Sequence, residues 1–285
     1  MTSFFAAFLL VRQAPEVTFD FTQPKGLIVA SVPGNGDRPL RVLVDTGAQR
    51  TVVDATLAKE LGLKPGDEVR ARGAAGTVDA RYAKGLRLAG LSDDLDAVVL
   101  PLAVIGAAIG TPIDAILGQD VLAKRVLQID AAAGKLTLGT RPPPVMASDS
   151  VISLHVRNGR PYLMATVVTP QGALVDAEML LDSGSDTTAE LAQPYADELG
   201  LRTVPDPGGR RILGVGGSVS LRLADVRELR VGDAVLPPGD VRVFFRPVGA
   251  SLDGDGRVGN GFLARYRATI DGPGQKLVLT PLRRS

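Results

Sequence analysis

Two short stretches of the sequence decide how the chain is interpreted: residues 42–47 read VLVDTG and residues 179–184 read MLLDSG. In each stretch, an apolar run typical of a buried strand ends in an aspartate, a small hydroxyl residue and a glycine. The glycine predicts a tight turn directly after Asp45 and after Asp182. Two acids placed in this way can face each other across a cleft if the segments around them are related by symmetry.

Further segments recur around the two acids in the same order. Residues 59–63 (KELGL) return as residues 197–201 (DELGL), and residues 117–125 (LGQDVLAKR) return as residues 258–266 (VGNGFLARY). The spacing between equivalent blocks drifts by a few residues, as small insertions between matched blocks would produce. Blocks that keep their order while their spacing drifts predict an old internal duplication.

On these residues the chain resembles the retropepsin-like and pepsin-like aspartic peptidases, as a single-chain bacterial-type member with two units in tandem. The similarity runs from about residue 26 to 138 and from about residue 161 to 279. It implies an all-β fold of two pseudo-symmetric β-barrel lobes, each with one or two short helices. In the family, an apolar-apolar-glycine element packs beside each catalytic loop. Residues 116–118 (ILG) match this element, whereas residues 257–259 (RVG) depart from it at Arg257.

The resemblance implies that Asp45 and Asp182 form a catalytic dyad that activates water for attack on a peptide bond. Like charges this close do not both ionise readily, so the pair shares one proton. The ionised carboxylate acts as general base, and the protonated one hydrogen-bonds the scissile carbonyl. The hydroxyl residues would bridge to the opposite loop, and the glycines leave room for a close backbone approach. These supporting residues are Thr46, Gly47, Ser183 and Gly184.

Two glycine-rich segments are candidates for flaps over the cleft. Residues 72–77 (RGAAGT) and residues 213–218 (LGVGGS) suit the tips of mobile hairpins that exclude water and hold substrate. The alternative is that both are ordinary glycine turns. The candidate flap residues are Gly73, Ala74, Ala75, Gly76, Gly214, Val215, Gly216 and Gly217.

Short helices are expected after each catalytic loop. Asp54 can cap the start of a helix, and Gly62 and Gly200 can end one. Second short helices are expected within the matching blocks at residues 117–125 and 258–266. The expected helices cover residues 55–61 and 189–199, and begin near Gln119 and near Asn260.

The repeat and a proline run define two predicted domains. Three prolines follow Arg141 at residues 142–144, which stops strand pairing and stiffens the connection. We therefore predict an N-terminal lobe over residues 1–141 and a C-terminal lobe over residues 150–285. Because both acids lie on one chain, we expect activity as a monomer.

Composition narrows the possible functions. The 285 residues are 45% hydrophobic and 22% charged with a net charge of +1, so no basic surface for nucleic acid is indicated. The absence of cysteine excludes thiol catalysis and disulfides. The one histidine, His155, lies in an alternating stretch and is interpreted as a strand surface residue. We expect no metal and no organic cofactor.

The amino terminus admits two interpretations. Residues 4–11 are an apolar run, too short to span a bilayer but long enough for the hydrophobic region of a signal peptide. Residues 17–21 alternate between apolar and polar and predict a strand, which in bilobal relatives helps to join the lobes. The run favours export to the periplasm. The alternative is a structural strand in a cytoplasmic protein.

The sequence therefore predicts an aspartic endopeptidase, a hydrolase with a polypeptide substrate, that uses Asp45 and Asp182. The main alternative is a catalytically silent module that retains the fold and binds peptides. Ala48 in the first unit where the second has Ser185, together with the departure at Arg257, shows that the units have diverged and keeps this alternative open.

Overall fold

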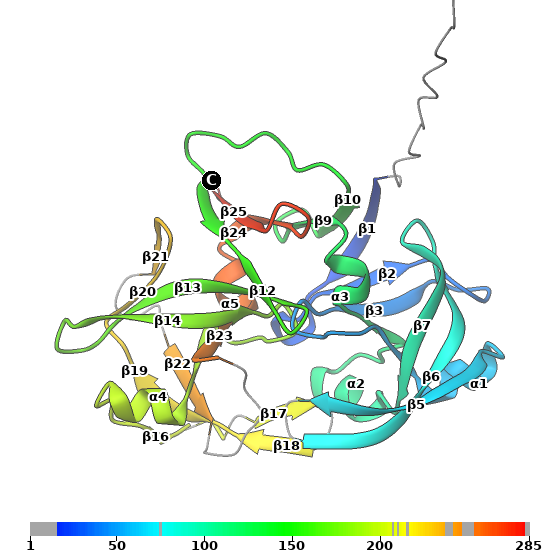
Figure 1. Ribbon diagram of the computed structural model, residues 1–285, viewed down its shortest axis with the longest axis horizontal. Helices are drawn as coiled ribbons and strands as arrows, with labels where there is room; N and C mark the ends of the chain where they lie inside the picture. Colours follow the sequence, from blue (N-terminus) through cyan, green and yellow to red (C-terminus); the bar gives the residue numbers. More distant parts are fainter. Residues whose placement is uncertain are drawn as a thin grey trace, which may run out of the picture.

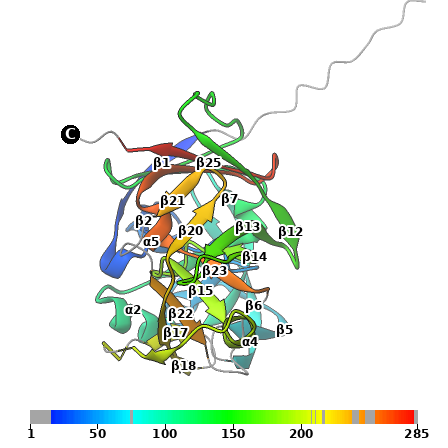
Figure 2. The ribbon, with the colours of Figure 1, turned by 90° about the vertical axis from the view of Figure 1, so that its left-hand side faces the viewer.

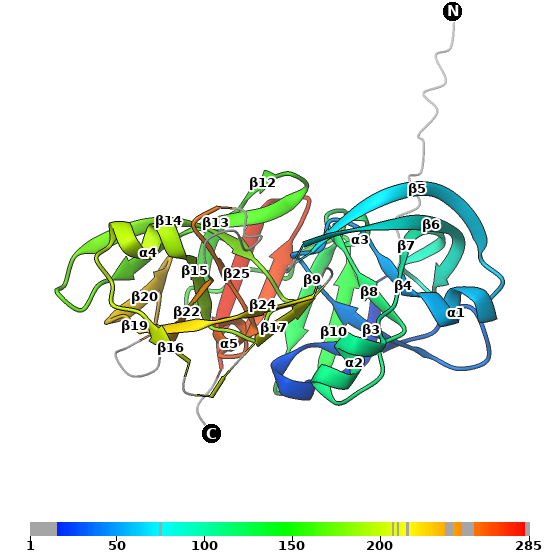
Figure 3. The ribbon, with the colours of Figure 1, turned by 90° about the horizontal axis from the view of Figure 1, so that it is seen from below.

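The computed structural model describes residues 16–73, 76–206, 208–209, 211–214, 217–236, 242–246 and 254–282. The protein is mostly β, with short helices between strands. We call residues 16–139 the first half and residues 150–282 the second half. Figure 3 shows the two halves side by side, with strands of both meeting between them.

The described residues of the first half form three α-helices and ten strands. Figure 1 shows this half, in blue to green, beside the second half. Its helices are α1 (Ala55–Glu60), α2 (Ala103–Ile109) and α3 (Gln119–Leu122), with a 3-10 turn at Pro24–Gly26. Its strands are β1 (Val17–Thr22), β2 (Val29–Val32), β3 (Leu40–Val44), β4 (Val52–Asp54), β5 (Lys64–Gly73), β6 (Gly76–Leu88), β7 (Ser92–Leu100), β8 (Ala115–Leu117), β9 (Val126–Asp130) and β10 (Lys135–Gly139).

The described residues of the second half form two α-helices and fifteen strands. The helices are α4 (Gln193–Glu198) and α5 (Asn260–Leu263). The strands are β11 (Ser150–Ser153), β12 (His155–Arg157), β13 (Arg160–Val168), β14 (Leu174–Leu181), β15 (Ala189–Ala192), β16 (Val204–Pro205), β17 (Arg211–Gly214), β18 (Gly217–Ser220), β19 (Arg222–Asp225), β20 (Glu228–Val231), β21 (Ala234–Leu236), β22 (Arg242–Arg246), β23 (Gly256–Val258), β24 (Tyr266–Asp271) and β25 (Lys276–Pro281).

A four-strand arrangement occurs in both halves. In the first half, β3 pairs parallel with β8, β8 pairs antiparallel with β4, and β4 pairs parallel with β7. In the second half, β14, β23, β15 and β22 pair in the same order and directions. Because β3 and β14 end just before the two aspartates, this shared arrangement puts both acids at the end of a strand that is hydrogen-bonded within its sheet.

Strands from both halves form one continuous sheet region. The order β11-β25-β24-β9-β10-β1 joins them, and β24 pairs with β9 so that Ala268 lies opposite Ile129. Figure 2 shows β25 and β1 at the same end of the molecule, away from β17 and β18. The predicted strand at residues 17–21 is confirmed as β1, which pairs with β10 and β2. Among the described residues the strands form open paths, and no closed barrel is found.

Burial of apolar side chains holds the halves together. One buried cluster draws on both halves and includes Leu117, Leu127, Leu181, Phe262 and Leu279. Full burial of a large apolar side chain contributes about 1.5–3 kcal/mol, so a cluster of this size is the main stabilising feature. Successive side chains of a strand point to opposite faces of the sheet, so about every second side chain of a strand joins this cluster.

The observed helices match those predicted from the sequence except in two places. Asp54 caps α1 by accepting hydrogen bonds from the N–H groups of Thr56 and Leu57, as expected, and α3 and α5 begin at the predicted positions. The predicted helix over residues 189–199 is wrong in its first turn, because residues 189–192 form strand β15 between β22 and β23. The helix begins at Gln193 instead, and Pro194 lies in its first turn, where proline is well tolerated.

Helix α2 is the second difference, and it gives the first half three helices where one or two were expected. Its first turn has no capping side chain of its own, since residue 102 is a leucine. The carboxylate of Asp54 accepts a hydrogen bond from the Leu102 N–H at 2.9 Å instead. Gly110 ends the helix in the left-handed conformation. The cap is distant in sequence, so local pattern did not indicate the helix.

Residues 140–149, where the lobe boundary is predicted, are mostly exposed and carry no helix or strand. The boundary itself stays a prediction. The apolar run at residues 4–11 lies outside the described residues. Within the described part of the chain, no helix has the length and apolar character needed to span a bilayer.

Candidate active site

The two aspartates lie against each other's glycine turns. Asp45 follows β3 and Asp182 follows β14. A Cβ atom built on Gly47 would lie 2.6 Å from Oδ1 of Asp182, and one built on Gly184 would lie 2.3 Å from Cγ of Asp45. Only glycine leaves room for a carboxylate at these distances. The structure therefore brings together the four residues that the two repeated stretches singled out.

Reciprocal hydrogen bonds join the two loops. The Thr46 hydroxyl donates to the Leu181 carbonyl at 2.6 Å and accepts from the Ser183 N–H at 2.9 Å. The Ser183 hydroxyl donates to the Val44 carbonyl at 2.8 Å and accepts from the Thr46 N–H at 3.0 Å. Both hydroxyl side chains are buried. These are the bridges to the opposite loop that the resemblance implied, and they fix the two acids relative to each other.

Backbone donors hold each carboxylate in its loop. Oδ1 of Asp45 accepts hydrogen bonds from the N–H groups of Gly47 at 2.8 Å and Ala48 at 3.0 Å. Oδ1 of Asp182 accepts one from the Gly184 N–H at 3.0 Å. The remaining oxygen of each carboxylate is therefore available for other partners, and for Asp182 that partner is a cation.

Arg257, the residue that departs from the family element, contacts Asp182. Its Nη1 donates to Oδ2 of Asp182 at 2.5 Å, and its Nε lies 3.5 Å from Oε2 of Glu190. The side chains of Arg257, Asp182 and Glu190 are 11%, 6% and 0% exposed. The departure does not disturb the packing of β23, which pairs with β14 as β8 pairs with β3.

The electrostatic environment favours a neutral Asp45. Burial raises the pKa of Asp45 to about 8, and the nearby negative charge and hydrogen bond of Asp182 add to this increase. The Gly47 N–H and the positive charge of Arg257 oppose it. The raised pKa favours a protonated Asp45 at neutral pH.

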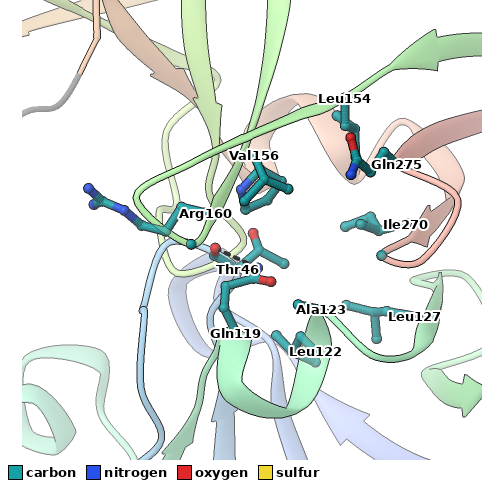
Figure 4. Close-up of a pocket in the computed structure, with 13 residues that line it drawn as sticks. Thr46, Gln119, Leu122, Ala123, Leu127, Leu154, Val156, Arg160, Ile270 and Gln275 are labelled. Carbon is teal, nitrogen blue, oxygen red and sulfur yellow. Dashed lines mark hydrogen bonds between the residues drawn. The ribbon is translucent and has the colours of Figure 1, made fainter.

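Two buried amides support the loops from behind. Gln119 Nε2 donates to the Thr46 carbonyl at 2.8 Å, and Asn260 Nδ2 donates to the Ser183 carbonyl at 2.7 Å. Figure 4 shows Gln119 and Thr46 at the edge of a cavity of about 30 Å³, lined mostly by apolar side chains and formed where the halves meet. This cavity is a small gap in the packing, with room for about two water molecules at most.

Sequence reasoning missed the role of these two amides. It treated both residues as helix starts, although they occupy equivalent positions directly after Gly118 and Gly259 in the repeat. A polar amide retained at equivalent buried positions was the signal that could have identified them. The contact of Glu190 with Arg257 was missed because the helix predicted there placed Glu190 on the wrong element.

A further pair of equivalent acids precedes β8 and β23. Asp114 accepts a hydrogen bond from the Arg41 N–H at 2.7 Å and also binds the side chains of Arg38 and Arg41. Asp255 accepts the equivalent hydrogen bond from the Glu178 N–H at 2.8 Å. Burial by itself would raise the pKa of Asp114, but its hydrogen bonds to Arg38 and Arg41 outweigh burial and hold that pKa well below its usual range.

A cleft of about 1410 Å³ opens over the two acids. This volume is larger than a typical small-molecule pocket and suits an extended chain. Its wall in the first half includes a buried apolar cluster with Leu43, Val52, Val98 and Ile116. In the second half, the described wall beside Asp182 includes polar side chains, among them Arg257.

Both candidate flaps are antiparallel hairpins. Strands β5 and β6 pair up to Gly73 and Gly76, and strands β17 and β18 pair up to Gly214 and Gly217. Gly73 lines the cleft, together with other residues of β5. Four of the candidate flap residues lie outside the described residues; they are Ala74, Ala75, Val215 and Gly216.

The site holds carboxylates, hydroxyls, amides and one arginine. In the part of the chain that the structure describes, no three His, Cys, Asp or Glu side chains gather as ligands for a metal ion. His155 lies on β12 and its Nε2 is 2.6 Å from Oε1 of Glu178. The chemistry that these groups can supply is proton transfer and hydrogen bonding.

A family model matches part of the first half. Residues 29–121 match the family model described as aspartyl protease. The matched segment contains Asp45 and extends through the apolar-apolar-glycine element into α3. The match supports the aspartic peptidase superfamily for this part of the chain. No curated protein matches the sequence.

Proposed function

We propose that the protein is an aspartic endopeptidase built from two tandem lobes, with Asp45 and Asp182 as its catalytic dyad. The observation that carries the proposal is the reciprocal bridging of the two loops by Thr46 and Ser183. Those bonds hold two carboxylates against each other at the floor of a cleft. A turn cap of no catalytic use would not require the two loops to bind each other.

The proposed mechanism uses a water molecule between the carboxylates. Ionised Asp182 takes a proton from the water molecule, and the water oxygen attacks the scissile carbonyl carbon. At the same time, protonated Asp45 donates a hydrogen bond to the carbonyl oxygen. The tetrahedral intermediate collapses when Asp182 passes the proton taken from water to the nitrogen of the leaving amine and the C–N bond breaks, which leaves Asp182 ionised and Asp45 protonated as at the start. No covalent bond to the protein forms at any step.

Cleavage of a diverse peptide pool from pH 3 to 8, read by mass spectrometry, tests the proposal. The native protein and the Asp182→Asn variant are compared side by side, with circular dichroism to verify that both are folded. Cuts present in the native sample and absent in the variant are the expected result. Equal cutting in both samples would contradict the dyad.

One observation favours the alternative of a silent peptide-binding module. A positive charge 2.5 Å from Asp182 makes that carboxylate a weaker base, which could abolish turnover while leaving the cleft intact. Such a module would still capture an extended peptide along an exposed strand edge. Binding of a statine-type peptide without any turnover between pH 3 and 8 would favour the module over the enzyme.

A further inference from the structure

The second half carries a buried ion pair where the first half is apolar. Arg257 on β23 lies opposite Leu180 on one side and opposite Glu190 of β15 on the other. In the first half, the residue in the place of Arg257 is Ile116, and the residue in the place of Glu190 is Val52. The first half shows that this part of the fold forms with aliphatic side chains, so the ion pair is not required by the strand arrangement.

Glu190 and its neighbours fix the position of the guanidinium. Oε1 of Glu190 accepts hydrogen bonds from the hydroxyls of Ser185 and Thr187, each at 3.2 Å. Its other carboxylate oxygen faces Nε of Arg257. Burial of both side chains leaves the guanidinium few alternative positions. Its Nη1 contacts Oδ2 of Asp182, whereas the Gly184 N–H contacts Oδ1.

The two acids of the dyad are therefore in unequal surroundings. Asp182 accepts hydrogen bonds from a guanidinium and a backbone N–H, whereas Asp45 accepts them from two backbone N–H groups. A nearby positive charge favours the ionised form of the carboxyl that it contacts. Loop geometry alone, which is nearly the same in both halves, would not distinguish the two acids.

We propose that Arg257 is a positioning residue that fixes the negative charge of the dyad on Asp182 and its proton on Asp45. The proposal rests on the proposed function and deepens it, because it assigns the base to the second half and the acid to the first. Substrate does not need to contact Arg257 for this role. The residue acts through Asp182.

The assignment has a consequence for pH dependence. The charged groups that act on one another here are Asp45 after β3, Asp182 after β14, Glu190 on β15 and Arg257 on β23. The guanidinium stabilises the singly charged dyad against uptake of a second proton. The competent form should therefore persist to lower pH than it would without Arg257, and it should end where Asp45 ionises, at a pKa of about 8.

The decisive experiment replaces the ion pair by the residues of the first half. The double variant Arg257→Ile with Glu190→Val removes both charges and keeps aliphatic packing, whereas Arg257→Lys keeps the positive charge. Two measurements are made on each protein. One is the pH profile of kcat/KM for a peptide cut by the native protein, and the other is carbon-13 NMR titration of labelled aspartate carboxyls, with Asp182→Asn and Asp45→Asn to assign the dyad signals.

In the double variant, we expect the acidic limb of the profile and the acid-range titration of the dyad to move to higher pH by about 1–2 units. Arg257→Lys, which keeps the positive charge, should keep both close to their native positions. Ile116→Val, a matched change in the first half, should alter the rate without moving the limb. A purely structural role for Arg257 would lower the rate equally at all pH values.

An unmoved limb and an unmoved titration in the folded double variant would overturn the proposal. The NMR measurement separates this failure from failure of the proposed function. If the native protein cuts no peptide at any pH but the dyad titration still shifts in the double variant, the positioning role stands and the peptidase assignment fails.

Discussion

The two halves share their aspartate-containing loops but differ in the strands directly behind them. Around Asp45, the sheet presents Ile116 and Val52, and around Asp182 the same two places hold Arg257 and Glu190. The bonds that join the loops are nearly identical in both directions. The geometry of the acids is therefore nearly the same in both halves, while their surroundings differ in charge.

This difference separates two requirements on the site. Holding two carboxylates together depends on the turn residues and their hydroxyls, which both halves retain. Deciding which carboxylate is ionised depends on a few buried side chains, which the halves do not share. A symmetric fold can in this way support a dyad with unequal members.

The largest effect is expected from breaking the ion pair on one side. Arg257→Ile alone leaves Glu190 buried without its cation, and removal of one partner of a buried pair costs about 3–5 kcal/mol. The double variant with Glu190→Val should recover most of that loss, because it reproduces the apolar pair of the first half. Urea unfolding of the two variants measures the difference. If the single and double variants were equally stable, Arg257 and Glu190 would not be equivalent to the apolar pair of the first half.

The loop bridges should show matched effects, since here the halves are alike. Thr46→Ala removes the partner of the Leu181 carbonyl and of the Ser183 N–H, and Ser183→Ala removes the equivalent pair. Two buried backbone groups left without partners cost about 2–4 kcal/mol in either variant. Urea unfolding should place the two variants within about 1 kcal/mol of each other, the usual scatter between equivalent sites. A much larger effect at one hydroxyl would show that the bridge is not reciprocal.

The acids that precede β8 and β23 should respond unequally. Asp114→Asn loses charged hydrogen bonds to two arginines and should cost about 1.5–3 kcal/mol at neutral pH. Asp255→Asn, the matched control, loses a single backbone contact and should cost less than about 1 kcal/mol. Because the folded pKa of Asp114 is lowered, its contribution is complete above about pH 3.9 and is lost as the pH falls further. Thermal unfolding at pH 7 and pH 2 tests both the ranking and the pH trend.

The smallest effect is expected from Asp45→Asn on stability. Because the folded pKa of Asp45 is raised to about 8, neutral Asp45 stabilises the protein fully below about pH 3.9 and this stability is lost as the pH rises toward 8. Asparagine does not ionise, so the free energy of unfolding of the variant should rise relative to that of the native protein as the pH increases. The difference should reach about 1–2 kcal/mol at pH 8, after allowance for contact with solvent in the cleft. A difference in Tm that does not change between pH 4 and pH 8 would contradict the raised pKa.

The parts of the fold that could be predicted are those fixed by local pattern. The apolar runs that end at Asp45 and Asp182, the capped helix after Asp54 and the alternating strand at residues 17–21 all follow from spacing within a few residues. The repeat then indicated that the two acids belong to equivalent loops, and the structure places them against each other.

The remaining features depend on contacts that are distant in sequence. Helix α2 takes its cap from Asp54, and strand β15 is a strand because β22 and β23 flank it. The sequence marked Arg257 as a departure but gave no indication of its partner. Glu190 is 67 residues away in the chain and was placed in a helix, so the ion pair became visible only once the strands were paired.

The most direct test of the account is peptide cleavage in water enriched in oxygen-18, with native protein, Asp45→Asn and Asp182→Asn. The account predicts one oxygen-18 atom in the new carboxyl terminus of each amino-terminal fragment that the native protein produces, and no cleavage by either folded variant. Cleavage that survives in either variant would contradict the claim that the two acids act together on one water molecule.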